Sequence, residues 1–278
     1  HYDVSNEFYA LFLDPEMVYS CAYFRDWATP LEQAQRDKLD MICRKLRLRE
    51  GQSFLDIGSG WGALLCHAAR HYGVSAHGVT LSQTQYDYCR AKIERLGLQD
   101  RVTVSLADYM TLEGRYDRIA SIGMYEHVGI ANYPGYFRKI HGLLSEGGVF
   151  LNHGITRRAK RNIRNFGKVS RGKRVILKYI FPGAELASIA EVLNSLARVT
   201  RLSLYHAQQI GTHYARTLHQ WRERFHARLP EVRAQGFDDR FIRMWEFYLA
   251  LSEAGFSTGA FGDLQIRLEK RRGRVLGS

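Results

Sequence analysis

The chain has 278 residues, 45% of them hydrophobic, and this length suits one domain carrying an insertion better than two independent domains. No segment approaches the ~20 uninterrupted apolar residues of a membrane-spanning helix, so we expect a soluble globular protein. Lys and Arg number 40 against 28 Asp and Glu, and the net charge of +12 predicts an anionic partner: a nucleic acid, an anionic membrane surface or a phosphate-bearing carrier.

The first residues and the cysteines indicate the compartment. The chain starts at His1, with neither the charged nor the apolar region of a signal peptide, and we expect that a native N-terminal portion precedes it. No C-x-x-C pair occurs among the cysteines, so the sequence predicts neither a metal site nor a disulfide framework, and a reducing cytoplasm fits best. The cysteines are Cys21, Cys43, Cys66 and Cys89.

Residues 1–29 are rich in aromatic side chains. This density is typical of core packing, although a tunnel for a lipid chain would have the same composition. Apolar residues then recur at helical spacing from Leu31 to Leu46, and Gly51 stops the pattern. We therefore expect one helix ahead of the first strand.

Strand-like and helix-like stretches alternate from residue 52 onward. We expect strands at 53–57, 74–79, 102–106, 118–122 and 148–153. Between them we expect helices at 63–72, 82–96 and 133–144. This alternation predicts an α/β fold with a doubly wound, mostly parallel sheet.

A basic segment interrupts this order. No acidic residue occurs between Gly147 and Ala184, whereas Lys and Arg crowd residues 157–178, so we expect a basic lid inserted into the fold. The basic residues are Arg157, Arg158, Lys160, Arg161, Arg164, Lys168, Arg171, Lys173, Arg174 and Lys178. Beyond the lid we expect a helix at 185–194, a strand at 199–205, helices at 212–225 and 238–254, and a last strand at 263–268.

Residues 54–62 form a strand that runs into a glycine-rich turn and then a helix. Gly58 and Gly60 let the backbone approach a ligand and expose N–H groups at the helix N-terminus, and Asp56 at the strand end can accept hydrogen bonds from a ligand cation. The turn also satisfies the dinucleotide fingerprint G-x-G-x-x-G/A. That fingerprint requires an acidic residue roughly 20 positions on to bind the ribose, where this chain has Val-Thr-Leu at 79–81. A nicotinamide cofactor is therefore the weaker interpretation.

Six short motifs, in order along nearly the whole chain, carry a resemblance to a known family. They are His-Tyr-Asp-Val-x-Asn-x-Phe-Tyr at 1–9, Tyr-Ser-Cys-Ala-Tyr-Phe at 19–24, Leu-Asp-Ile-Gly-x-Gly-Trp-Gly at 55–62, Gly-Val-Thr-Leu-Ser-x-x-Gln at 78–85, Met-Tyr-Glu-His-Val-Gly at 124–129 and Tyr-Ile-Phe-Pro-Gly at 179–183. Together they resemble the cyclopropane fatty acyl phospholipid synthases and their mycolic acid relatives, which are S-adenosylmethionine-dependent methyltransferases. The resemblance implies a Rossmann-like class I methyltransferase fold, and residues 156–177 depart from the family pattern.

The resemblance implies contacts to S-adenosylmethionine along the strand ends. Tyr19 and Ser20 match residues that close over the methionine end of the cofactor, and residues 80–85 replace the usual ribose-binding acid. The implied cofactor-binding residues are Tyr19, Ser20, Asp56, Gly58, Gly60, Thr80, Leu81, Gln85, Asp108, Tyr109 and Ile122. Without the family, plain core packing would explain Tyr109 and Ile122 equally well.

The resemblance also implies a catalytic group that cradles a bicarbonate ion, formed by Cys21, Glu126, His153, Ile155 and Tyr214. Taken singly, these residues have plainer explanations, such as a small buried thiol or a satisfied core histidine. A physical argument supports the assignment, because methyl transfer to an unactivated alkene leaves a carbocation. Closing a cyclopropane ring then requires a base beside the added carbon, and we expect bicarbonate to be that base.

We expect a single domain over residues 1–278. Its parts would be an N-terminal helical cap over the cofactor at 1–50, a cofactor-binding core at 51–155, a basic lid and acyl-substrate region at 156–235, and a C-terminal helix and strand at 236–278.

The leading hypothesis is transfer of a methyl(ene) group from S-adenosylmethionine to a cis double bond of a phospholipid acyl chain, which forms a cyclopropane. The sequence does not separate this reaction from methylation without ring closure. Methylation of a small amine is disfavoured because a cationic lid repels a protonated amine, and a nucleic-acid enzyme is disfavoured because no Asn-Pro-Pro-Tyr or Pro-Cys motif occurs. We expect a cytoplasmic enzyme, peripherally bound to the inner face of the membrane at an anionic surface, with no nucleic-acid partner and with a homodimer left open.

Overall fold

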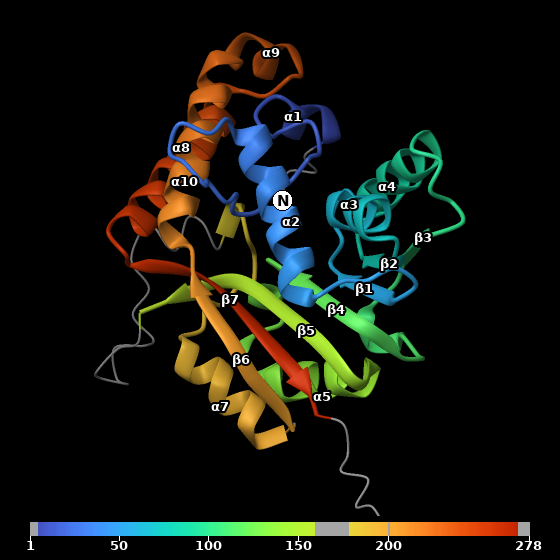
Figure 1. Ribbon diagram of the computed structural model, residues 1–278. Helices are drawn as coiled ribbons and strands as arrows, with labels where there is room; N and C mark the ends of the chain where they lie inside the picture. The colour runs from blue at the N-terminus through green and yellow to red at the C-terminus, as the bar shows by residue number, and fades with distance from the viewer. Residues whose placement is uncertain (1–4, 159–177, 200, 272–278) are drawn as a thin grey trace, which may run out of the picture.

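Seven strands form one sheet in the computed structural model, which describes residues 5–158, 178–199 and 201–271. The strands are β1 Ser53–Ile57, β2 Ser75–Thr80, β3 Val102–Leu106, β4 Tyr116–Ile122, β5 Leu144–Arg157, β6 Leu202–Gln209 and β7 Phe261–Lys270. Their order in space is β3-β2-β1-β4-β5-β7-β6, and β7 runs antiparallel to both of its neighbours while the other pairs are parallel (Figure 1). The predicted doubly wound, mostly parallel sheet is therefore confirmed.

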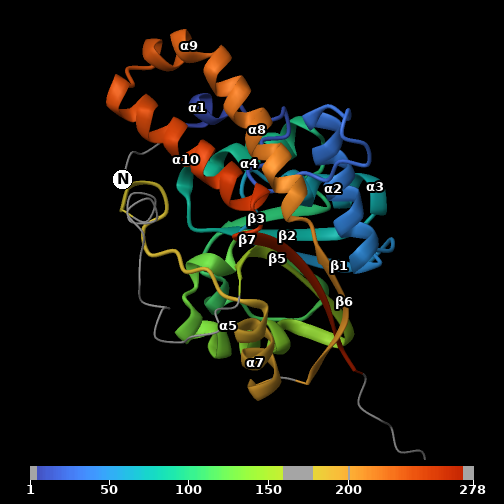
Figure 2. The ribbon, with the colours of Figure 1, turned by 90° about the vertical axis from the view of Figure 1, so that its left-hand side faces the viewer.

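Helices cover both faces of the sheet. They are α1 Asn6–Ala10, α2 Leu31–Leu46, α3 Ala63–Tyr72, α4 Gln83–Arg95, α5 Tyr133–Leu143, α7 Ile189–Val199, α8 Gly211–Ala227, α9 Leu229–Ala234 and α10 Asp239–Ser257. Helices α5 and α7 lie on one face, and α2, α3 and α4 lie on the other (Figure 2). Because side chains alternate along a strand, Phe54 packs toward α2 and α3 whereas Leu55 and Ile57 pack toward α5.

A third core, made largely of aromatic side chains, joins α1 to α8 and α10. Phe8 packs edge-to-face against Phe225 and Trp245, with ring centroids 6.1 Å and 5.0 Å apart. This unit, formed by the N-terminal segment with α8 and α10, lies above the sheet in both views, and we call it the aromatic cap (Figures 1 and 2). The aromatic residues of the N-terminal segment thus build a packed core, the first of the two interpretations of their composition.

The predicted elements occur in the predicted order, with shifted ends. Strand β5 is longer than the expected 148–153, and α7 begins four residues after the expected start at 185, where Ser188 and Glu191 bond to each other at the helix start. Helix α9 was not predicted, because six residues are too few to show the hydrophobic periodicity of a helix. Most of the basic segment lies outside the described residues, as do residues 272–278.

The described ends of the basic segment bind within the protein. Arg157 donates to both carboxylate oxygens of Glu191, at 2.7 Å and 2.8 Å, and Arg158 donates to the carbonyl of Thr258. Within the part of the chain that the structure describes, no helix combines the length and the apolar character needed to cross a bilayer.

Candidate active site

A cavity of about 390 Å³ lies between the carboxyl ends of the parallel strands and the aromatic cap. Its walls come from the ends of β1, β4 and β5 below, and from α2, α8 and α10 with the segment 17–21 above. In doubly wound sheets this edge is where ligands bind, because all parallel strands present their following loops there. The cavity is therefore the natural candidate for the active site.

The glycine turn after β1 forms one end of the cavity. Gly58 and Gly60 both line it, and their φ angles of +78° and +54° lie in the left-handed region that favours glycine. A Cβ added at Gly60 would meet no atom within 4 Å, so this position borders open space. The backbone there can come close to a ligand.

Two buried groups of opposite charge face this end. Asp56 is 3% exposed and its Oδ1 has no hydrogen-bond partner, while burial raises the pKa of its carboxyl to about 7. Lys38, on α2, is 2% exposed and its Nζ donates to Ser20 Oγ at 3.0 Å. Burial lowers the pKa of Lys38 to about 8, against the opposing attraction of nearby carboxylates such as Asp56 and Asp14. A ligand donor bound at this end of the cavity would satisfy the unpartnered oxygen of Asp56.

Lys38 belongs to none of the six motifs in the sequence. A signal was present, because Lys38 stands between Ala34 and Ile42 at intervals of four residues, on the apolar side of its helix, where a charged residue is rarely buried without a partner.

The implied cofactor-binding residues separate into two groups. Those that line the cavity are Tyr19, Ser20, Asp56, Gly58, Gly60, Gln85 and Ile122. Thr80 lies behind them and donates to Gln85 Oε1 at 2.9 Å. Asp108 caps its own turn by accepting from the backbone N–H of Met110, Tyr109 packs on Tyr136, and Leu81 is 76% exposed. The latter three lie outside the cavity wall. The cofactor role of the whole set stays a prediction.

All five residues implied for catalysis line the same cavity: Cys21, Glu126, His153, Ile155 and Tyr214. Glu126 follows β4, and its Oε1 accepts from the backbone N–H of Ile155 on β5 at 2.7 Å. Its Oε2 is buried without a partner, and burial raises the pKa of the Glu126 carboxyl to about 8. Gly154 permits this approach, since a Cβ there would lie 2.8 Å from Glu126 Oε1.

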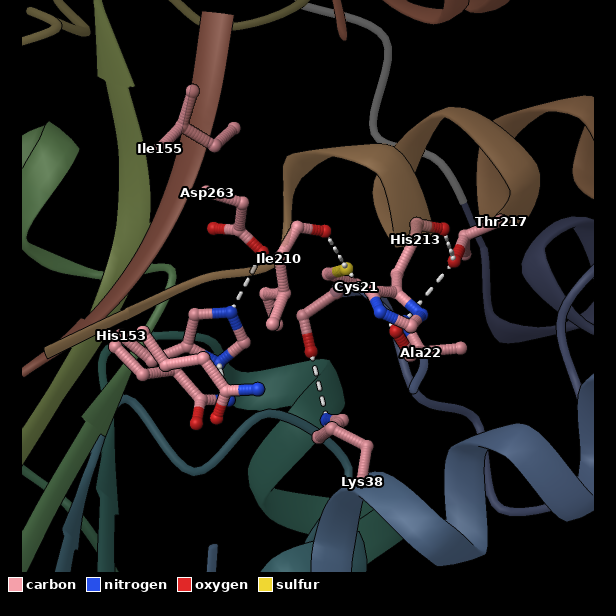
Figure 3. A network of polar contacts seen from close by, with 12 residues as sticks. Cys21, Ala22, Lys38, His153, Ile155, Ile210, His213, Thr217 and Asp263 are labelled. Atoms are coloured by element: carbon pink, nitrogen blue, oxygen red, sulfur yellow. Dashed lines mark hydrogen bonds and ion pairs between the residues drawn. The ribbon is translucent and has the colours of Figure 1, made fainter. Parts of the chain in front are cut away.

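His153 is bonded to a carboxylate that the sequence analysis did not identify. Its Nε2 lies 2.7 Å from Asp263 Oδ2, and both side chains are 2% exposed (Figure 3). Asp263 belongs to β7 and pairs in register with Ile155 on β5, which brings it to the wall of the cavity. The antiparallel pairing of β5 with β7 joins residues more than 100 positions apart, which no local pattern reveals. An Asp in a predicted buried strand was the one available signal.

The segment that carries Cys21 is fastened to α8. The backbone N–H of Ala22 donates to Thr217 Oγ1 at 3.1 Å, and the Cys21 thiol lies 3.7 Å from the carbonyl of Ile210 (Figure 3). The N–H of Phe24 donates to His213 Nδ1. Burial raises the pKa of the Cys21 thiol well above its usual range, and the nearby Asp263 carboxylate adds to this. Cys21 is therefore a neutral thiol at the wall and not a nucleophile.

Comparison with known proteins places this geometry in a family. The family model named mycolic acid cyclopropane synthetase matches residues 1–266. The chain belongs to this family of S-adenosylmethionine-dependent methyltransferases. The crystal structure of the mycolic acid cyclopropane synthase CmaA1, complexed with SAH (S-adenosylhomocysteine) and CTAB, is similar with a TM-score of 0.90 at 33% identity, covering 97% of this chain and 96% of that one. The class I methyltransferase fold is thereby confirmed.

Two sequence relatives are similar over nearly all of the chain. A "probable fatty acid methyltransferase" of Pseudomonas putida is 41% identical over 262 residues, which are 93% of this chain and 65% of the relative. The cyclopropane-fatty-acyl-phospholipid synthase of Escherichia coli strain K12 is 40% identical over 257 residues, which are 92% of this chain and 63% of the relative. This family member thus spans less than two thirds of the length of both relatives.

The raised pKa of Glu126 predicts a pH-dependent contribution to stability. The ordinary pKa is 4.5 and the folded value is about 8, so the protonated carboxyl stabilises the fold below about pH 4.5, and this contribution is lost as the pH rises through about 8. Glu126→Gln does not titrate. Its free energy of unfolding relative to the wild type should therefore increase between these pH values, by at most ~1.4 kcal/mol per pH unit. Urea denaturation across this range measures the difference, and a constant difference would contradict the burial of an ionisable carboxyl here.

Proposed function

We propose that this protein transfers a methyl(ene) group from S-adenosylmethionine to a cis double bond of an unsaturated phospholipid acyl chain, forming a cyclopropane fatty acyl chain, with bicarbonate as the general base. One observation carries the proposal: a single cavity is lined at one end by the glycine turn with Asp56, and at the other by Glu126 and Tyr214. A methyl donor and a proton-removing site can thus act on one substrate atom.

The cofactor end suits the methionine portion of S-adenosylmethionine, which carries an ammonium, a carboxylate and a sulfonium. Asp56 Oδ1 can accept a hydrogen bond from the ammonium. The open space beside Gly60 can hold the methionine side chain of the cofactor. Lys38 keeps a positive charge near Asp56 and holds Ser20 in place. The unpartnered oxygen of Asp56 would then gain a hydrogen-bond donor from the cofactor.

The apolar part of the cavity suits an acyl chain. Aromatic side chains from the cap, including Tyr214, Tyr248 and Phe256, form its upper wall, and Tyr214 stacks on Phe256 with ring centroids 4.5 Å apart. An unactivated alkene is a weak nucleophile, so the walls must hold it in line with the methyl group and exclude water. Water would otherwise capture the carbocation before the ring closes.

The catalytic end suits the removal of a proton from the added carbon. Bicarbonate, when bound, supplies the base. Because the pKa of Glu126 is about 8, its carboxyl is mostly protonated near neutral pH and can donate a hydrogen bond through the otherwise unpartnered Oε2. Tyr214 offers its hydroxyl from the opposite wall. The backbone N–H of Ile155 is already bonded to Glu126, so Ile155 acts by orienting that carboxyl.

Methylation of the double bond without ring closure is the second candidate. The name of the Pseudomonas putida relative, a fatty acid methyltransferase, favours it without specifying a ring. Both reactions share the methyl transfer and the cation, and they differ in which proton is removed afterwards.

The proposal also includes peripheral binding to an anionic membrane surface, which the net charge of +12 supports.

Asp56→Asn tests the cofactor site. Removing a buried charge that accepts from an ammonium should weaken the binding of SAH by about 10- to 100-fold, which corresponds to ~1.5–3 kcal/mol. The affinity of the wild type should also fall as the pH drops below about 7, where Asp56 becomes protonated. Isothermal titration calorimetry measures both effects, with the exposed Asp100→Asn as the matched control. Unchanged affinity in Asp56→Asn, with a normal melting temperature, would remove Asp56 from the site.

Glu126→Gln tests the reaction. Purified protein is incubated with S-adenosylmethionine and anionic vesicles that contain cis-unsaturated phospholipid, and the acyl chains are identified by gas chromatography with mass spectrometry. We expect a cyclopropane product from the wild type, slower turnover in bicarbonate-depleted buffer, and recovery when bicarbonate is restored. The amide of Glu126→Gln can still donate a hydrogen bond but cannot share or exchange a proton with the bound anion. This variant should therefore bind SAH normally and lose about 10²- to 10⁴-fold in rate, the usual scale for acid–base groups.

The possible products separate the two candidates. A branched, uncyclised chain would establish methylation without ring closure. Turnover that is indifferent to bicarbonate would exclude the proposed base, and normal turnover in Glu126→Gln would exclude the catalytic end as we describe it.

A further inference from the structure

A chain of hydrogen bonds runs from the protein surface to the catalytic end of the cavity. It passes from Lys45 on α2 to Gln265 on β7, then to His153 on β5 and to Asp263 on β7. Lys45 Nζ lies 2.5 Å from the side-chain oxygens of both Gln265 and Gln208. An ammonium only donates, so the amide oxygen of Gln265 is the atom that faces Lys45.

The orientation of Gln265 determines where the proton of His153 lies. With its oxygen on Lys45, Gln265 directs its amide nitrogen toward His153 Nδ1, 3.4 Å away. An amide nitrogen only donates, so Nδ1 must accept and carries no proton. The proton of the neutral ring is then on Nε2, where it is donated to Asp263 Oδ2 at 2.7 Å. A charged imidazolium would place an N–H against the amide N–H of Gln265.

We propose that Asp263 and Gln265 are positioning residues of the active site, which together hold His153 as the neutral tautomer with its proton on Nε2. In this arrangement both ring nitrogens are engaged within the protein. Asp263 is thereby fixed at the cavity wall, which His153 also lines.

The position of Asp263 explains why the arrangement matters for chemistry. Asp263 is 1% exposed and lines the cavity beside Cys21, opposite Ile155 in the strand register. The burial of Glu126 is the largest cause of its raised pKa, and the charge of Asp263 raises this pKa further. Glu126 therefore retains its proton near neutral pH. Any effect of this raised pKa on turnover rests on the proposed function. The tautomer of His153 does not rest on it.

The tautomer can be measured directly. We would label the histidines of the full chain with ¹⁵N and record long-range ¹H–¹⁵N correlation spectra near pH 7, with the His153 signals assigned by their loss in His153→Gln. The wild type should show a neutral ring protonated on Nε2. Gln265→Glu, nearly the same size, turns the donor at Nδ1 into an acceptor, and His153 should become a doubly protonated imidazolium. Asp263→Leu removes the acceptor at Nε2 but leaves the Gln265 donor at Nδ1, so the ring should stay neutral and protonated on Nε2.

Gln208→Glu is the matched control, because Gln208 bonds to Lys45 but does not contact His153. It should leave the His153 spectrum unchanged. A wild-type ring protonated on Nδ1, a charged wild-type ring, or a neutral ring in Gln265→Glu would each overturn the proposal. If no lipid product forms with the wild type while the tautomers follow this pattern, the proposed function fails and the positioning network remains.

Discussion

Desolvation at the carboxyl ends of the parallel strands is the constraint on which the rest of the structure depends. The aromatic cap closes over this edge of the sheet and takes Asp56, Glu126 and Asp263 out of water. Burying carboxylates is costly unless each gains a partner or a proton. Asp263 is bonded to His153, Glu126 retains a proton, and Asp56 keeps one oxygen without a partner in the protein.

Lys38 balances this concentration of acidic groups. Its ammonium is buried at the same cavity, and the carboxylates of Asp14, Asp56 and Asp263 oppose the loss of its proton. The charge of Lys38 lowers the pKa of the Asp14 and Asp56 carboxyls, against the opposite effect of their burial. The cavity can then present a carboxylate to the cofactor at one end and a protonated carboxyl to a small anion at the other.

The fold could be predicted because its signals are local. Alternating strands and helices indicated the doubly wound sheet, and the glycine turn after β1 lies where that pattern places a ligand. The residues proposed for catalysis came from a family resemblance. Glu126, His153 and Ile155 meet in one cavity because β4 and β5 end at the same edge. Glu126 beside Ile155 is a consequence of that register.

The missing parts depend on contacts between distant segments. Asp263 meets His153 only because β7 inserts between β5 and β6 in the antiparallel direction, a strand order that alternation alone does not specify. Lys38 faces Ser20 because the cap segment folds back over α2. Leu81 shows the converse: it is in a matching motif, yet its side chain points to solvent. The sequence pattern therefore indicated most of the residues that line the cavity, and tertiary packing determines the electrostatics of that cavity.

A crystal structure of the protein with SAH and bicarbonate tests the central claim most directly, since it locates the two ends of the cavity independently of any rate. The account predicts the SAH ammonium within hydrogen-bond distance of Asp56 Oδ1, the sulfur directed toward the catalytic end, and the anion bonded to Glu126 and Tyr214. SAH bound outside this cavity, or an Asp56 oxygen still unpartnered in the complex, would contradict it.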